Sequence, residues 1–247
     1  MTISEDRWAL ALMGHSFDLQ EAEDVWGSGE AIRIAKVRHI AGQQWTALFA
    51  DAFSSLQTAA EVNELGAPIV DRLNGLLFVR DPGRRPLSIH GVLERRTEDG
   101  FVQHVFLAAE ATVRARAFAR LYGGTSVPPP EQRWLPQSLT DDALADVLTF
   151  LRGQPDWFDL WKAFEMMRED IQARSGRKPW HRSGVAWPDE RRMDRFEATA
   201  NHHRHSRARR IEMPKDGWMS LREGRQWVAA LVRPWLNWRA SNDGPGP

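Results

Sequence analysis

The chain of 247 residues contains no cysteine, which excludes disulfide bonds, thiol catalysis and cysteine-ligated zinc and fits a reducing compartment. It carries no excess charge, because 33 basic residues balance 33 acidic ones. Any attraction for nucleic acid must therefore come from local clusters. No run approaches the roughly 20 apolar residues of a membrane helix, and the N-terminal segment does not resemble a signal peptide. We expect a cytoplasmic protein with no membrane partner.

The first half of the chain has the patterns of an antiparallel sheet. Short apolar or alternating runs predict strands, and Asp99-Gly100 predicts the turn of a hairpin. One helical stripe, formed by Val62, Ile69, Leu73 and Leu76, predicts a helix over residues 56–77 that packs on this sheet. We thus expect a β-rich domain over residues 1–124. Its predicted strands cover residues 7–14, 31–40, 44–50, 87–96, 101–110 and 112–121.

Three consecutive prolines, 128–130, mark a change of pattern, since proline suits neither a helix interior nor a central strand. We expect a proline-rich linker over 125–138, a helical domain over 139–240 and a disordered tail over 241–247. The overall class is α+β, with the sheet domain followed by a four-helix bundle. The predicted helices are 141–152 after a Thr140 cap, 157–174 after an Asp156 cap, 189–203, and 221–238 after a capping box of Ser220 and Glu223.

Most of the 12 tryptophans lie after Arg133, against a single tyrosine in the whole chain. Those that fall on apolar helical stripes are predicted to be core residues, namely Trp157, Trp161, Trp227 and Trp235. For loop residues such as Trp218, stacking on nucleic-acid bases is the functional alternative to a core role.

The helix over 189–203 carries the strongest candidate site. Arg195 and His202 are seven residues apart, nearly two helical turns, so both side chains leave the same face. Histidine can transfer a proton near neutral pH, and arginine can hold a phosphate through two hydrogen bonds. Together they can cleave RNA, with His202 assisting proton transfer as the 2′-OH attacks and Arg195 stabilising charge on phosphorus.

Other residues near this pair extend the candidate site. His205 is the alternate acid or base, and Asn201 and Glu165 are candidates to orient the pair. A second set can contact phosphate, namely Arg204, Arg207, Arg209 and Arg210. The simpler interpretation is a solvated basic helix end. We expect no cofactor. We also expect no metal at His202, His203, His205 and Glu165, because the adjacent His202 and His203 point about 100° apart on a helix.

Residues 139–238 resemble the HEPN (higher-eukaryote and prokaryote nucleotide-binding) family. The resemblance rests on "RFEATANH" (Arg195 to His202), on "DLWKAFEMMREDI" with Glu165, and on "PKDGWMSLREGRQWVAALVRPWL". It implies a four- or five-helix bundle and a metal-independent ribonuclease in a defence or toxin system. Arg195 and His202 would then react at a homodimer interface, with RNA as the partner.

Two functional hypotheses follow. The first is this ribonuclease or a ribonuclease-like effector. The second is a non-catalytic dimerising or ligand-binding module, which Phe196 favours, with an unknown ligand for the β-rich domain. A structure can separate them. The ribonuclease requires Arg195 and His202 to converge in a cleft, whereas the binding module is favoured if Arg195 pairs with a carboxylate and His202 faces solvent.

Overall fold

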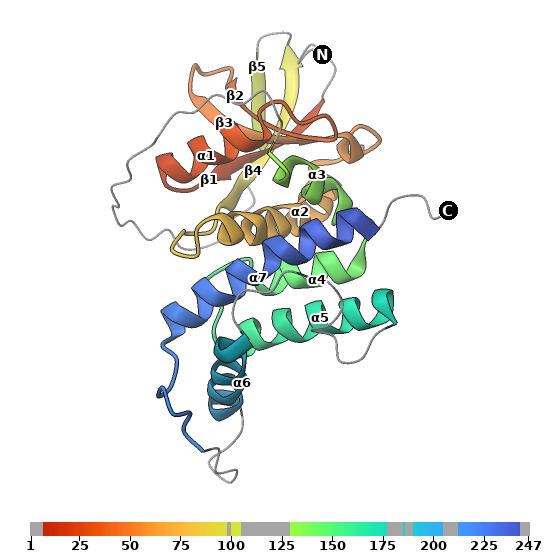
Figure 1. The fold of residues 1–247 in the computed structure, drawn as a ribbon. Helices are drawn as coiled ribbons and strands as arrows, with labels where there is room; N and C mark the ends of the chain where they lie inside the picture. The colour runs from red at the N-terminus through yellow and green to blue at the C-terminus, as the bar shows by residue number, and fades with distance from the viewer. Residues whose placement is uncertain are drawn as a thin grey trace. The chain divides into compact units, whose positions relative to one another are not determined.

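The computed structural model describes residues 7–97, 100–104, 129–176, 185, 190–204 and 212–242. Within these ranges the protein is mixed α+β, with a five-stranded antiparallel sheet and seven α-helices (Figure 1). It divides into two compact units. The sheet unit comprises residues 1–71 and 85–140, and the helical unit comprises residues 72–84 and 141–247. Helix α2 (Ala59–Arg80), predicted over 56–77, begins in the first unit and ends in the second.

The sheet has the strand order β2-β3-β1-β4-β5. Each pair of neighbours is antiparallel, so the predicted antiparallel sheet and its first four strands are confirmed. Of the strand predicted over 101–110, residues 101–104 are confirmed and residues 105–110 lie outside the described residues. The sixth predicted strand, 112–121, lies outside the described residues, as do residues 98 and 99 of the predicted turn. The strands are β1 (Trp8–Met13), β2 (Ile32–Arg38), β3 (Gln44–Ala50), β4 (Ser88–Thr97) and β5 (Gly100–His104).

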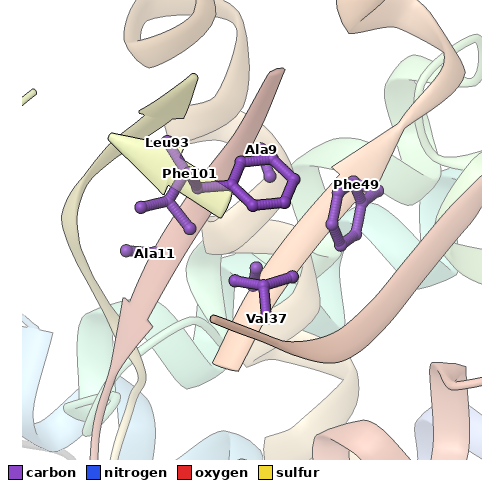
Figure 2. Packing of buried hydrophobic residues seen from close by; sticks show 7 residues of the cluster. Ala9, Ala11, Val37, Phe49, Leu93 and Phe101 are labelled. Carbon is purple, nitrogen blue, oxygen red and sulfur yellow. The ribbon is translucent and has the colours of Figure 1, made fainter. Parts of the chain in front are cut away.

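Alternate residues of the strands build two apolar faces. One face gathers small and aromatic side chains, with Phe49 and Phe101 in an edge-to-face contact at 6.1 Å (Figure 2). On the opposite face, Leu10 meets the first part of α2 at Gly66. A Cβ atom at position 66 would lie 2.3 Å from Leu10 Cδ1, so any larger residue would require the Leu10 side chain to shift. The sheet unit therefore buries both faces of its central strand.

Two helices were not expected from the sequence. Helix α1 (Ser16–Trp26) buries only Ala22, Val25 and Trp26, which is too few residues for a clear apolar stripe. Helix α3 (Glu131–Gln137) occupies part of the segment predicted to be a proline-rich linker. The prolines precede its first turn, where a missing N–H costs little. Burial of Trp134 and Leu135 then anchors α3 within the sheet unit.

The helical unit contains α4 (Asp142–Phe150), α5 (Trp157–Ser175), α6 (Glu190–Arg204), α7 (Leu221–Asn242) and the last turns of α2 (Figure 1). The predicted caps are confirmed at Asp156 and at the Ser220–Glu223 capping box. The predicted Thr140 cap is wrong. The Asp141 carboxylate accepts the Leu144 N–H at 3.0 Å instead, because Asp141 is the residue that directly precedes the first turn.

Aromatic rings form the core of this unit around Phe196, whose side chain is fully buried. Its ring lies 4.5 Å from Trp227, 5.5 Å from Phe164, 6.0 Å from Trp157 and 6.5 Å from Trp161, measured between centroids. The four tryptophans predicted to be core residues are all buried, which confirms that prediction. Phe196 therefore fixes the orientation of α6 against α5 and α7.

A buried ionic network joins α5 and α7. The Asp170 carboxylate accepts hydrogen bonds from Arg174 Nε and Trp235 Nε1, both at 2.8 Å, and lies 3.0 Å from Arg239 Nη1. Arg239 and Arg174 also pair with Asp141. Asp141 thus both caps α4 and ties it to this network.

None of the helices within the described ranges combines the length and the apolar character needed to cross a bilayer.

Candidate site on helix α6

The face of α6 that carries Arg195 and His202 is covered by the segment Gly217–Met219. Arg195 donates from Nε to the Gly217 carbonyl and from Nη2 to the Trp218 carbonyl, both at 2.9 Å. One turn further on, Thr199 Oγ1 accepts the Met219 N–H at 3.1 Å. We call Gly217–Met219 the covering segment. It places backbone groups where a phosphate bound to Arg195 on this face would lie.

The covering segment also meets His202. The rings of His202 and Trp218 stack with centroids 4.3 Å apart and planes 19° apart. Gly217 has φ +71°, a left-handed conformation that glycine adopts at low cost and that turns the chain onto α6. Arg195 and His202 therefore share one helix face, as their spacing predicts, but Trp218 lies against His202 and its carbonyl against Arg195.

Arg195 also faces a carboxylate. Its Nη1 lies 3.6 Å from Glu223 Oε1 of α7. The hydrogen bond from the Ser220 N–H is the main cause that lowers the pKa of Glu223, and the Ser220 hydroxyl and the Arg195 charge act in the same direction. Glu223 is thus ionised at neutral pH and holds the guanidinium. Arg195 lines a small cavity between α6 and α7, but His202 is absent from its lining.

At the C-terminal end of α6, three successive side chains each contact a tryptophan ring. His203 is exposed and stacks on Trp157 with centroids 5.3 Å apart and planes 2° apart. The Arg204 guanidinium lies 4.6 Å from the Trp161 ring centroid. We call His202, His203 and Arg204 with their three tryptophans the ring platform. Such an arrangement offers flat surfaces for bases and donors for phosphate.

Glu165 pairs with Lys162, its neighbour one turn earlier on α5. It accepts a hydrogen bond from Lys162 Nζ at 2.7 Å, and this bond is the main cause that lowers its pKa. The charge of Arg204 lowers the pKa of Glu165 further. Asn201 Oδ1 accepts a weak contact from Arg204 at 3.5 Å. Of the predicted site residues, Glu165 and Asn201 therefore lie near Arg204 rather than between Arg195 and His202.

Four predicted residues, His205, Arg207, Arg209 and Arg210, lie outside the described residues. Sequence reasoning missed the covering segment as a partner of α6 and missed the ring contacts of Trp157 and Trp161. The sequence signal that could have pointed to Trp218 is its position in a loop rather than on an apolar helical stripe. No group of three or more potential metal ligands occurs among the residues that the structure describes.

A second polar cluster lies in the sheet unit and was not predicted. The buried carboxylate of Glu94 contacts Arg7 Nη2 at 3.0 Å, Arg96 Nη2 at 2.6 Å and His104 Nε2 at 3.1 Å. Burial raises the pKa of Glu94, but the hydrogen bonds from Arg7 and His104 and the charges of Arg96 and Arg7 outweigh it, so the pKa is lowered. With three partners, Glu94 is a satisfied structural anion.

Comparison of the chain with protein-family models, with curated proteins and with solved structures finds no match. The HEPN resemblance therefore stays a hypothesis about residues 139–238. The function has to be inferred from the geometry of α6 and its surroundings.

Proposed function

We propose that the helical unit is a non-catalytic module that binds single-stranded RNA. The observation that carries this proposal is the covering segment, which uses two donors of Arg195 and lies against His202. A phosphodiester that reacts between Arg195 and His202 would need the space that Trp218 occupies. The ring platform supports binding, because aromatic and cationic groups at its surface suit stacked bases and phosphates.

We propose in addition that α4, α5, α6 and α7 form a HEPN-like four-helix bundle. The shared aromatic core around Phe196 supports a common packing of α5, α6 and α7. The ribonuclease alternative requires the covering segment to move away from α6. Only then would Arg195 and His202 both be available to react with RNA.

Cleavage and binding of the same RNA distinguish the two functions. Purified protein in EDTA is incubated with labelled total RNA and tRNA, beside His202→Ala and Arg195→Ala variants with matched melting temperatures. We expect intact RNA in all three samples. Metal-independent cleavage by the wild type that both variants lose would replace the binding proposal with the ribonuclease.

Binding is measured by fluorescence anisotropy on a labelled 12-uridine RNA. We expect the double change His202→Ala with His203→Ala to weaken binding by about tenfold, since each stacked base contributes about 1–3 kcal/mol. The control is His15→Ala with His39→Ala, two histidines of the sheet unit. Equal affinity of the wild type and the platform variant would contradict the assignment of the ring platform.

A further inference from the structure

Two adjoining cavities follow the surface of α7 within the helical unit. The first, of about 140 Å³, lies between α6 and α7 and is lined by Arg192, Arg195 and Glu223 among others. The second, of about 570 Å³, is lined by Arg80 at the end of α2, by Pro82 just after it, and by Arg233 and Asn237 of α7. Both are bordered by Gln226 and Ala230, so they form one depression, which we call the α7 groove.

The floor of the α7 groove is a single face of the helix. Its residues, Glu223, Gln226, Ala230, Arg233 and Asn237, are spaced by three or four positions and are all exposed. At 1.5 Å per residue they extend over about 21 Å. The small side chain of Ala230 lies at the middle, where the two cavities meet. The groove is therefore elongated and continuous.

The lining of the α7 groove is strongly cationic, although the whole chain carries no net charge. Among the described residues that line it, four are arginines, Arg80, Arg192, Arg195 and Arg233, and one is a carboxylate, Glu223, which already pairs with Arg195. Arg192 forms no ion pair with any residue in the described part of the chain. Cations distributed along an elongated groove suit a linear polyanion better than a single ion.

We propose that the α7 groove holds the phosphodiester backbone of single-stranded RNA. This inference rests on the RNA-binding function proposed above and names the path of the strand. The groove begins beside the covering segment, because Met219 and Arg195 line its first cavity. A strand whose bases stack on the ring platform can therefore continue along α7, where Arg192, Arg80 and Arg233 would contact phosphates.

The test uses the full chain and the 12-uridine RNA, with Arg80→Gln and Arg233→Gln combined. Both changes are distant in sequence from the ring platform. The matched control is Arg38→Gln with Arg222→Gln, two exposed arginines outside the groove lining. We expect the groove variant to bind about tenfold more weakly and the control less than twofold. The slope of log affinity against log salt falls by about 1.4 for two lost phosphate contacts on a single strand.

Each alternative outcome is distinct. Equal affinity of the groove variant and its control, with RNA binding still weakened in the His202/His203 variant, would overturn the groove and leave the binding function standing. A wild type that fails to bind RNA at low salt would overturn both. Groove-dependent binding of a 12-residue polyglutamate but not of RNA would assign the groove to an acidic protein segment and overturn the RNA path.

Discussion

At the scale of single residues, Phe196 directly follows the candidate site residue Arg195 but has a structural role in the core. Its ring is fully buried among four other aromatic rings. We expect Phe196→Ala to lower the free energy of unfolding by about 3–5 kcal/mol, as for other large buried aromatic residues. Urea denaturation measures it. The control is Phe158→Ala, because Phe158 is 51% exposed on the adjoining helix α5. A similar loss in both variants would show that Phe196 is not a core residue.

His203 predicts a pH dependence of RNA binding. Although His203 is exposed, partial desolvation of its ring is the main cause that lowers its pKa, and the charge of neighbouring His202 lowers it further. Because the folded-state pKa lies below its ordinary value near 6.5, the neutral form is favoured in the folded protein. The associated stability is present above that ordinary value and is lost as the pH falls through the lowered pKa.

Protonation of His203 adds a positive charge to the ring platform, so RNA affinity should rise as the pH falls from about 7.5 to about 5.5. Anisotropy titrations across this range test it, with His203→Gln as the comparison. We expect a flatter pH profile for the variant. An identical rise in both proteins would place the titrating group elsewhere.

At the scale of elements, the Asp170 network holds α5 to α7. Asp170 has three partners and Arg239 is almost fully buried. We expect Asp170→Asn to remove one of the two carboxylates that pair with the buried Arg239 guanidinium, so that only Asp141 remains. The loss should cost about 1.5–3 kcal/mol, the range for a hydrogen bond to a charged group. Thermal and urea unfolding measure this loss. The neighbouring Glu169→Gln changes the same charge at an exposed position and should change stability little. Equal stability of both variants would contradict the role of the network.

Local signals predicted most elements. Alternating residues gave five strands, and Asp156, Ser220 and Glu223 gave two helix starts, because these patterns act over a few residues. Helix α3 escaped prediction because burial of Trp134 outweighs the signal of the prolines before it. The shared face of Arg195 and His202 followed from helical spacing alone. The covering segment could not be predicted from this spacing, because Gly217–Met219 is about 20 residues away along the chain.

At the scale of the whole molecule, two compact units share the continuous helix α2. The homodimer implied by the family resemblance stays a prediction. Sedimentation equilibrium of the full chain should show a mass near twice 28.2 kDa. A monomer across micromolar concentrations would contradict it, although the ring platform and the α7 groove belong to one chain and do not require a second copy.

Because the whole chain has no net charge, its proposed attraction for RNA must come from cations clustered on the helical unit. One experiment tests the central claim, that this unit binds RNA without cleaving it. Labelled 12-uridine RNA is incubated in EDTA with saturating protein, and equal portions run on native and denaturing gels. We predict a retarded band on the native gel and full-length RNA on the denaturing gel. Shortened RNA that depends on Arg195 and His202, or RNA that is neither retarded nor cut, would contradict the claim.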